Sequence, residues 1–501
     1  MTYQEILAQS PDEFGSHEQP TARGFVKLAQ AGKEIWNAWR KDYPAYRDEK
    51  TKEWHRRIHW IDTNSQLIQL APSNIDFSEF HFGDGANFYG QLFSPARVTS
   101  FERAKFGDDT VFRDCTFHGG MTFRSAVFGN RTQFSKVNVT RASDLQDAPF
   151  VAFDGATFGD QTEFNAFNAY WDMPDQDANV VSFQECQFGD NSILNFLNQS
   201  NRSTMFNFRS VTFGSGADFS NFDFGRLLSL TNGRFRGHVS FKDAQISEAI
   251  FDHCNFGTST DFSGRTFGSI SFRATVFPGG CDFTNREFKS ATNFANAQFA
   301  KVPIFHECKL HQDTEFTCGE SFPIKPEGTS TASRAYRTLK LAMNQHQATR
   351  EEQFFFRREM REERVELWKS KSPGKRLRSA LYYLYEKLSD YGSSVLIPFI
   401  WLAKVWIIVA VLFAMISPEA QLWIPGKNSL DVGRTLQWLV YSIATSAPLT
   451  GLDETSRNLG QQIGANANSA WFTLILFLHK TIALLFLFLM LLGMRNAFKM
   501  K

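Results

Sequence analysis

The sequence has few cysteines, and their spacing fits no common cysteine chemistry. Only 6 of its 501 residues are Cys, and no two of them form a C-x-x-C pair. This spacing argues against a zinc ribbon and against a disulfide framework, so a reducing compartment is expected. The first residues, MTYQEILAQSPDEF, lack the basic and then apolar stretch of a signal peptide. We therefore expect the long N-terminal part to stay in the cytosol.

The chain has almost no net charge and lacks the common catalytic motifs. The 53 Lys and Arg residues balance 52 Asp and Glu residues, so a net charge of +1 gives no general attraction to nucleic acid. The chain has no GxxxxGK, GxSxG or HExxH motif and no GxGxxG after a strand, and its acidic residues are spread out. We predict a protein that is not an enzyme, has no cofactor and has no catalytic or metal-binding residue.

Phenylalanine, in contrast, is abundant and regularly spaced. A bulky apolar residue recurs every five or six positions from Phe208 to Phe316, and the same spacing runs from Phe77 to Phe134. Neither an α-helix nor a flat strand has that period. A step of about five suits a coil with four short sides, in which one apolar residue per side points to the axis and successive coils stack. The predicted core phenylalanines include Phe106, Phe128, Phe213, Phe256, Phe283 and Phe299.

The residue two positions before each bulky residue is usually small, as a second inward position requires. Five of the six cysteines occupy this slot and are predicted to be buried, unreactive thiols: Cys115, Cys186, Cys254, Cys281 and Cys308. A group with the composition of a metal site comprises His306, Cys308, His311 and Cys318. Both histidines directly follow a bulky residue and should point outward, away from Cys308, so a metal is not expected there.

A glycine often follows the bulky residue and opens a six-residue step. These glycines are Gly83, Gly107, Gly129, Gly159, Gly189, Gly214 and Gly257. We expect them to supply corners with positive φ. The spacing lapses at 140–152, 165–182 and 195–207, which predicts loop insertions on the surface. Residues 77–322 would then give roughly ten coils and a rod about 50 Å long.

This pattern resembles that of the pentapeptide-repeat proteins, whose right-handed quadrilateral β-helix has a bulky residue at the centre of each five. The segment GKEIWNAWRKDYP, from Gly32 to Pro44, also resembles the lead-in of such proteins. Phe replaces the usual Leu and many steps have six residues, which implies a looser variant. The resemblance implies a mainly β solenoid over 71–323 after an N-terminal helical cap, 1–70. Family members range from DNA mimics that bind topoisomerases to scaffolds, so the resemblance does not fix a function.

Helical periodicity replaces the five-residue step after the rod. Ala335, Leu339 and Met343 fall on one helical face, and a second helix carries the run FFFRREM. This run resembles the YYREM-like segment that precedes transmembrane spans in membrane-attached pentapeptide-repeat proteins. We predict an α-helical hairpin and a juxtamembrane helix over 329–392, with residues 380–388 at the membrane interface.

Two stretches in the module 393–501 are long and apolar enough to cross about 30 Å of hydrocarbon. These predicted transmembrane α-helices are 395–417 and 471–494, and the ending LLGMRNAFKMK looks like that of membrane pentapeptide-repeat proteins. Basic residues precede the first stretch and follow the second, whereas the loop between them carries only three. We therefore expect both termini and the solenoid on the cytoplasmic side of the inner membrane.

The segment 434–451 is apolar but too short to cross, which favours an interfacial helix on the outer face; a re-entrant segment, as in a two-span pore subunit, is the alternative. Lys404, His479 and Lys480 fall inside the spans, where a charge is costly unless it faces protein or water. Outward snorkelling of Lys480 and simple packing of Lys404 is an equally good interpretation. The candidate residues for pore or membrane function are Lys404, Ser446, Thr450, His479 and Lys480.

Two functions remain open from the sequence. The first is an oligomeric membrane effector or channel-like protein, gated by a cytosolic partner and suited to stress or phage defence. Two spans per chain cannot enclose a pore, so this function needs a homo-oligomer. The second is a membrane-tethered scaffold without a pore, whose mildly acidic rod attracts basic proteins. In both cases the expected partners are the lipid bilayer and a cytosolic protein on the solenoid, and nucleic acid is not expected.

Overall fold

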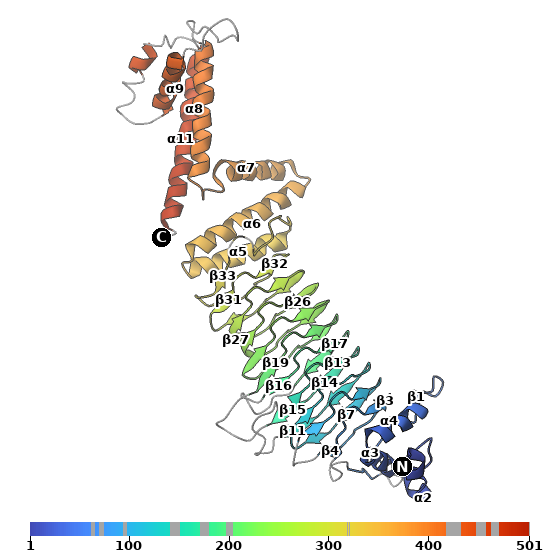
Figure 1. Ribbon diagram of the computed structural model, residues 1–501. Coiled ribbons are helices and arrows are strands. Elements are labelled where there is room, and N and C mark those ends of the chain that lie inside the picture. Colours follow the sequence, from blue (N-terminus) through green and yellow to red (C-terminus); the bar gives the residue numbers. More distant parts are fainter. Residues whose placement is uncertain are drawn as a thin grey trace. The chain divides into compact units, whose positions relative to one another are not determined.

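The structure is a computed structural model that describes residues 1–61, 66–69, 75–93, 98–140, 151–170, 180–196, 204–317, 319, 321–416, 432–446, 457–461 and 470–499. The chain forms two compact units, Met1–Lys325 and Pro326–Lys501. The first contains a β-solenoid of about nine turns, and the second contains helices that include two long apolar ones (Figure 1). The predicted fold class is confirmed at this level, with about nine turns in place of roughly ten. Its handedness and quadrilateral cross-section stay predictions.

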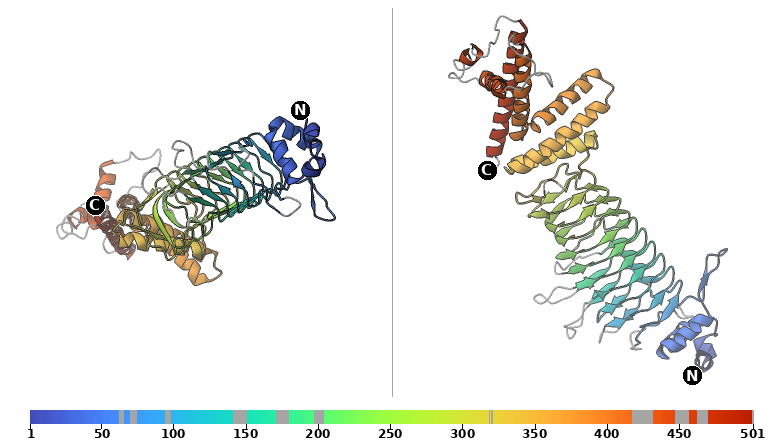
Figure 2. Two further views of the ribbon diagram at one scale, coloured as in Figure 1. Left: turned by 90° about the horizontal axis from the view of Figure 1, so that it is seen from below. Right: turned by 45° about the horizontal axis from the view of Figure 1, so that its top comes forward.

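The solenoid is built from short parallel strands, each paired with strands one turn before and one turn after it (Figures 1 and 2). The β7 ladder comprises β7 (Val111–Arg113), β10 (Gln133–Ser135), β14 (Glu163–Asn165), β18 (Ile193–Asn195), β21 (Ala217–Asp218), β24 (His238–Ser240), β26 (Ser259–Asp261) and β29 (Gly280–Asp282). The β5 ladder comprises β5 (Thr99–Ser100), β9 (Met121–Thr122), β12 (Val151–Ala152), β16 (Val180–Ser182), β19 (Met205–Asn207), β22 (Leu227–Ser229), β25 (Ile246–Ile250), β27 (Thr266–Ser271), β31 (Thr292–Phe294) and β33 (Glu315–Phe316), with β30 (Glu287–Phe288) paired to β27. The β4 ladder comprises β4 (Leu92–Phe93), β8 (Thr116–Phe117), β11 (Asn138–Thr140) and β15 (Asn168–Tyr170). Further short ladders pair β3 (His81–Gly83) with β6 (Lys105–Phe106), β28 (Val276–Phe277) with β32 (Gln298–Phe299), and β13 (Thr157–Phe158), β17 (Gln187–Phe188), β20 (Thr212–Phe213) and β23 (Arg234–Phe235) in sequence.

Strand register stays constant where the turns differ in length. Phe134 pairs with Phe112 on one side and with Phe164 on the other, so one turn adds 22 residues and the next adds 30. The additional residues of the longer turn include 141–150, which lie outside the described residues. Most of the other two predicted insertions also lies there. Insertion therefore lengthens the connection without moving the aromatic positions.

Phenylalanine rings fill the solenoid axis in stacks that run from turn to turn. Phe128 lies between Phe106 and Phe158, with ring centroids 4.7 and 4.9 Å away and interplanar angles of 3° and 4°. Neighbouring stacks meet edge to face, as where Phe106 contacts Phe112 at 5.5 Å and 73°. Aromatic rings prefer both arrangements, which explains why this core accepts Phe at nearly every step. The phenylalanines named from the sequence are at most 4% exposed: Phe106, Phe128, Phe213, Phe256, Phe283 and Phe299.

The glycines after the bulky residues do not act as the predicted corners. Of the predicted set only Gly83 has a positive φ, of 75°. The others lie outside the left-handed region: Gly107, Gly129, Gly159, Gly189, Gly214 and Gly257. The positive φ falls two residues after the glycine, as at Asp109 with 55° and Arg131 with 57°. The prediction was wrong about which residue makes the corner.

Close approach of the preceding turn explains these glycines instead. A Cβ atom on Gly159 would lie 2.6 Å from the backbone nitrogen of Asn130 and 2.6 Å from the carbonyl carbon of Gly129. Only glycine leaves room for this contact. The Asn130 side-chain oxygen accepts a hydrogen bond from the backbone N–H of Asp160 at 2.8 Å, and the backbone N–H of Asn130 donates to Asp108 Oδ1 at 2.8 Å. Side-chain oxygens thus link successive turns along this line of glycines.

One charged residue occupies a small-residue slot. Arg286 precedes Phe288 by two positions and is fully buried, with 0% exposure. Its guanidinium donates to the carbonyl oxygens of Phe241 at 2.9 Å and Ala244 at 3.0 Å, and its Nε donates to the carbonyl of Phe262. Burial lowers the pKa of Arg286 to about 10. Carbonyl groups from two earlier turns therefore replace the water that this cation has lost.

Short helices precede the solenoid: α1 (Tyr3–Leu7), α2 (Pro11–Phe14), α3 (Ala22–Gln30) and α4 (Lys33–Asp42), followed by the antiparallel pair β1 (Tyr46–Arg47) and β2 (Trp54–His55). Trp36 of α4 is fully buried, and its ring lies 5.5 Å from Phe80 and 5.6 Å from Phe82. The Trp36 indole also donates to the carbonyl oxygen of His81 at 2.8 Å. Helix α4 therefore supplies aromatic surface to the first turn, which has no earlier turn to pack on.

The second unit is helical. Its helices are α5 (Ser330–Gln345), α6 (Thr349–Lys369), α7 (Pro373–Ser389), α8 (Leu396–Ile416), α9 (Val432–Ser446) and α11 (Ala470–Lys499). Helices α5 and α6 form a hairpin, in which Leu339 and Phe355 are fully buried. Glu359 of α6 is 4% exposed, and its carboxylate accepts hydrogen bonds from Arg337 and Lys340 of α5, both at 2.6 Å. The two ion pairs on this buried carboxylate hold α5 and α6 in one register.

Candidate functional site

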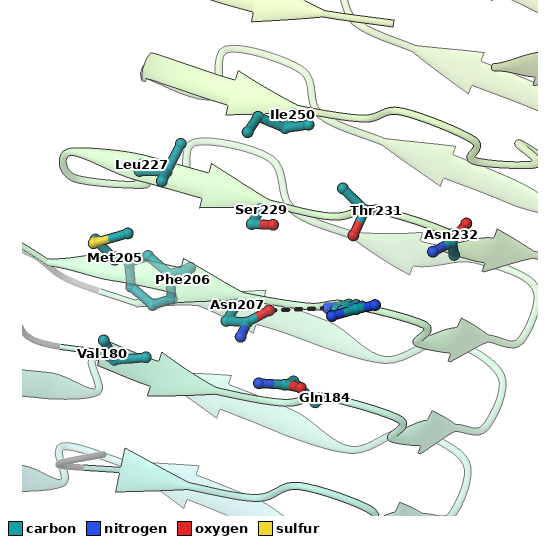
Figure 3. Close-up of a pocket in the computed structure, with 11 residues that line it drawn as sticks. Val180, Gln184, Met205, Phe206, Asn207, Leu227, Ser229, Thr231, Asn232 and Ile250 are labelled. Carbon is teal, nitrogen blue, oxygen red and sulfur yellow. Dashed lines mark hydrogen bonds between the residues drawn. The ribbon is translucent and has the colours of Figure 1, made fainter. Parts of the chain in front are cut away.

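A groove lies on the outer face of the β5 ladder, over β16, β19, β22 and β25 (Figure 3). Its volume is about 430 Å³, and Val180, Met205 and Leu227 form an apolar line along it. Ser229 and Asn207 lie beside that line, and the Asn207 side chain accepts a hydrogen bond from the backbone N–H of Arg209 at 3.3 Å. The groove therefore has a mixed polar and apolar surface.

The cysteines and histidines singled out from the sequence are not gathered into a site. The Cys308 thiol donates to the carbonyl oxygen of Phe283 at 2.8 Å, and Cys318 lies outside the described residues. Within the described parts of the chain, no group of three or more His, Cys, Asp or Glu residues is placed to hold a metal ion. Burial raises the pKa of the Cys115 and Cys254 thiols to about 12, which keeps them protonated and unreactive at neutral pH.

Ion pairs join the hairpin to the next helix. Arg357 of α6 lies 2.7 Å from Asp390, just after α7, and Arg361 contacts the same carboxylate at 3.2 Å. Arg361 and Arg364 also contact Glu386 of α7 at 3.0 and 3.3 Å. These side chains are half-buried, so the pairs are screened less than surface pairs. A displacement of α6 would therefore move α7 with it.

Helices α8 and α11 cover the two predicted spans. With 21 and 30 residues they are about 32 and 45 Å long. Both are long and apolar enough to cross a membrane, and apolar side chains on their outer faces are exposed, including Ile407 at 57% and Leu484 at 60%. By length and composition, these two helices could span a bilayer.

Contacts between α8 and α11 fix which residues share one height. Leu402 and Ala483 belong to one buried apolar cluster, and the ring of Phe413 lies 4.7 Å from that of Phe472. The step from Leu402 to Phe413 is 11 residues, and the step from Ala483 back to Phe472 is also 11. The helices are therefore antiparallel, with equal advance along their axes. The height of Lys404 corresponds to residue 481, one position from Lys480.

Helix α9 is about 22 Å long for its 15 residues, too short to cross, and it packs against both long helices. At its middle, Trp438 contacts Phe413 at 6.3 Å, close to the end of α8. At its last residue, the Ser446 hydroxyl accepts a hydrogen bond from the Trp406 indole at 2.8 Å. Helix α9 thus runs along α8 and ends near the middle of α8. After it, Leu459 packs again with the cluster around Phe413.

The contact of α9 with α11 places polar atoms in the interior. His479 is 1% exposed, and its Nε2 lies 2.9 Å from the carbonyl oxygen of Ser442. His479 Nδ1 and the Ser442 hydroxyl are buried without a hydrogen-bond partner among the described residues. Buried polar atoms without partners are uncommon and call for an explanation such as water or rearrangement. No sequence pattern could have paired these two residues, because the contact depends on where α9 docks.

The two lysines face outward in the single chain. Lys404 is exposed, with its ammonium 4.6 Å from the centre of the Trp401 ring, and Lys480 is also exposed. Of the candidate residues, Ser446 of α9 contacts α8, and His479 of α11 contacts Ser442 of α9. Lys404 and Lys480 share one height at the surface. Thr450 lies outside the described residues.

Comparison with known proteins identifies part of the solenoid. Residues 101–149 match the family model described as pentapeptide repeats (9 copies). The resemblance predicted from the phenylalanine spacing is confirmed by this match, by the β-solenoid and by the two long apolar C-terminal helices. Searches of curated proteins and of solved structures found no match. The comparison therefore bears on the solenoid and not on the chemistry of the apolar helices.

Proposed function

We propose that this protein is a non-enzymatic, homo-oligomeric membrane protein in which α8 and α11 cross the inner membrane and the assembled helices form a gated pore. The solenoid lies in the cytosol and binds the protein that gates it. One observation carries the proposal: Lys404 and Lys480 are exposed on the single chain at the same height, near the end of α9.

The cost of those charges in lipid favours assembly. Lys404 follows the start of α8 by eight residues, about 12 Å, which places it well inside about 30 Å of hydrocarbon. A lysine at the centre of a membrane helix costs roughly 2.5–3.5 kcal/mol on insertion scales. Its contact with Trp401 returns about 0.5–2 kcal/mol as a cation–π interaction, so contact with lipid remains unfavourable. A water-filled lumen between several copies removes the cost.

Helix α9 supports the same proposal as a re-entrant segment. The middle of α9 lies at the level of Phe413, its last residue lies at the level of Trp406, and the chain is back near Phe413 by Leu459. A half-helix that ends at mid-membrane is tolerated where it is buried in protein or lines a water-filled cavity. Water from such a cavity would also satisfy His479 Nδ1 and the Ser442 hydroxyl, which have no partner in the described part of one chain.

The distribution of basic residues supports the proposed orientation. Helix α7, immediately before α8, carries 4 Lys or Arg residues and 1 Glu. Arg495 and Lys499 lie at the end of α11. Because cytoplasmic flanks of membrane helices are enriched in Lys and Arg, both ends of the module belong on the cytoplasmic side.

The alternative function is a membrane-tethered scaffold that binds protein without forming a pore. The groove on the β5 ladder favours it, because a volume of about 430 Å³ can seat a few side chains of a bound protein. A tether does not require Lys404 and Lys480 to share a height, nor a half-helix that ends beside them. For this reason we place the pore first.

The oligomeric state and the ion flux together test the proposal. We expect the full-length protein in detergent to have the mass of three or more copies, measured by light scattering with correction for bound detergent. In liposomes we expect ion flux that Lys404→Leu lowers at least tenfold and that Lys404→Arg retains. Ile408→Leu, an uncharged change on the exposed side of α8, serves as the matched control. A monomer or dimer without flux would overturn the pore and leave the tethered scaffold.

A gated pore of this kind would suit stress or phage defence, in which a signal inside the cell changes the permeability of the membrane. Survival after phage challenge should then differ between cells that express the native protein and cells that express Lys404→Leu. Equal survival would remove this role while leaving the flux result intact.

A further inference from the structure

Helix α7 carries a largely exposed apolar stripe, and we infer that this stripe inserts into the cytosolic leaflet while the basic residues around it bind anionic phospholipid headgroups. The inference rests on the proposal that α8 and α11 cross a bilayer. It concerns a different surface from the pore, and it assigns a lipid class as the partner.

The face of α7 that contacts α6 is polar. The Ser379 hydroxyl donates to the backbone carbonyl of Arg364 at 2.8 Å, and the ring of Tyr383 lies 5.5 Å from the Arg364 guanidinium. Glu386 accepts the ion pairs from Arg361 and Arg364. Residues 379, 383 and 386 recur at helical spacing, so they define one side of α7. This side is occupied by α6.

The opposite side is apolar. At 3.6 residues per turn, Leu377, Leu381, Leu384 and Leu388 lie about 140–200° around the helix from Ser379. We call these four residues the α7 stripe. Leu377, Leu381 and Leu384 are 65%, 56% and 51% exposed, so the described residues leave about half or more of each side chain uncovered. Three large exposed apolar residues in one line mark an interaction surface.

Leu388, at the C-terminal end of the α7 stripe, shows where the stripe lies relative to α8 and α11. Leu388 packs with Leu402 of α8 and with the cluster of Ala483 and Phe486 on α11. The stripe therefore ends where α7 meets the buried contact between α8 and α11. In Figure 1, α7 runs at a steep angle to α8 and α11, as a helix lying in the membrane plane does beside helices that cross it. A bilayer that contains α8 and α11 would meet the stripe along its length.

The charges around the stripe select the lipid. Arg376, Arg378 and Lys387 lie about 90–110° around α7 from the centre of the stripe, whereas Lys375 lies on the α6 side. Arg378 also contacts Glu363 of α6 at 3.2 Å, and the one carboxylate of α7, Glu386, is already engaged by α6. The Lys387 ammonium lies 5.6 Å from the centre of the Tyr383 ring, a pairing typical of the membrane interface. Basic residues flanking an inserted apolar face bind anionic headgroups, so a leaflet rich in phosphatidylglycerol fits better than a neutral one.

Spin labels measure the predicted depth in the full-length protein reconstituted in liposomes. Single cysteines replace Leu381 on the α7 stripe, Leu484 on the exposed face of α11, and Leu341 on α5, which is 52% exposed. We expect the Leu381 and Leu484 labels to collide with oxygen and to be shielded from an aqueous nickel complex, and the Leu341 label to show the reverse. An aqueous Leu381 label beside a lipid-embedded Leu484 label would overturn the role of α7 alone. If both labels were aqueous, the crossing of α11 would fail, and the inference with it.

A second measurement tests the headgroup class. Adding phosphatidylglycerol to phosphatidylcholine liposomes should increase the inserted fraction of the Leu381 label, by roughly fivefold in equilibrium constant for each basic side chain engaged. The double variant Arg376→Gln with Lys387→Gln, which removes two basic residues beside the stripe, should remove most of that increase. The pair Arg334→Gln with Arg350→Gln, which removes the same charge from exposed sites of the hairpin, should leave it unchanged. An increase that is absent in the native protein, or equally reduced by both pairs, would overturn the selectivity for anionic lipid.

Discussion

The solenoid and the apolar helices differ in which side chains they bury and which they expose. In the solenoid, phenylalanines such as Phe128 and Phe213 are inside, and charged residues such as Arg131 are outside. In the helical module, Ile407 and Leu484 point outward while Ser442 and His479 are inside. The contrast teaches that the two regions are built for different surroundings. Water drives phenylalanine into the solenoid, whereas the bilayer proposed around α8 and α11 would exert no such pressure on leucine and would leave packing and polar contacts to join the helices.

The largest expected change in stability comes from removing an aromatic ring from the solenoid. Phe128→Ala should lower the free energy of unfolding by about 3–5 kcal/mol, because it opens a cavity between Phe106 and Phe158. Val127→Ala, at a neighbouring position that is 44% exposed, should change it by less than about 0.5 kcal/mol. Denaturation of the detergent-purified protein, followed by circular dichroism, gives both values. Similar losses for the two variants would mean that the stacks do not dominate stability.

A pair of glycines tests the spacing between turns. Gly159→Ala should cost about 1–3 kcal/mol, because the new methyl group meets the backbone of the preceding turn at 2.6 Å. Gly280→Ala should be close to neutral, because nothing lies within 4 Å of its Cβ position. The same denaturation experiment compares them. A neutral Gly159→Ala would show that the turns can separate, and that close approach does not explain the glycine.

The buried thiols predict a dependence on pH. Burial raises the pKa of Cys254 from its ordinary value of 9.0 to about 12. The thiolate then forms more readily in the unfolded chain, so the stability contributed by Cys254 is complete below pH 9 and is lost as the pH rises toward 12. Between pH 9 and 10 the native protein should lose up to about 1.4 kcal/mol relative to Cys254→Ala. If the difference between the two proteins stays constant over this range, the thiol is not buried as described.

The smallest effect concerns the polar interior of the helical module. Ser446→Ala removes the hydrogen bond from Trp406 and should cost about 0.6 kcal/mol, the average for such bonds between membrane helices. Ser442→Ala, one turn earlier on α9, removes a buried hydroxyl without a partner in the described residues and should be neutral or stabilising. Thermal unfolding in mild detergent compares the two. A larger loss for Ser442→Ala would place an unseen partner, such as water, at that hydroxyl.

The sequence predicted those features of the fold that repeat. Spacing alone placed Phe128 inward and Cys254 in the small-residue slot, because each depends only on its position within a turn. The same reasoning failed for Gly159, since the sequence shows that a glycine is needed there and not whether φ or crowding requires it. Crowding comes from Asn130, which is 29 residues earlier in the chain.

The candidate site was less accessible to the sequence. Lys404 and Lys480 could be found as charges within apolar stretches, but their common height follows from how α8 and α11 pack, with Leu402 in the cluster of Ala483 and with Phe413 against Phe472. The place of His479 depends on where α9 docks, which no periodicity encodes. The stripe on α7 was partly visible as an interfacial segment, but which side faces away from α6 follows only from the contacts of Ser379 and Glu386.

The buried guanidinium of Arg286 has a consequence for how the chain avoids misassembly. A stack of nearly identical turns offers each new turn several wrong places to pair, and most aromatic positions fit equally well after a slip of one turn. Arg286 needs three particular carbonyl oxygens, from Phe241, Ala244 and Phe262. A slipped pairing would strand a charge in an aromatic interior without those acceptors, at a cost of several kcal/mol. One residue thus gives an otherwise repetitive sequence a unique reference point for its own alignment.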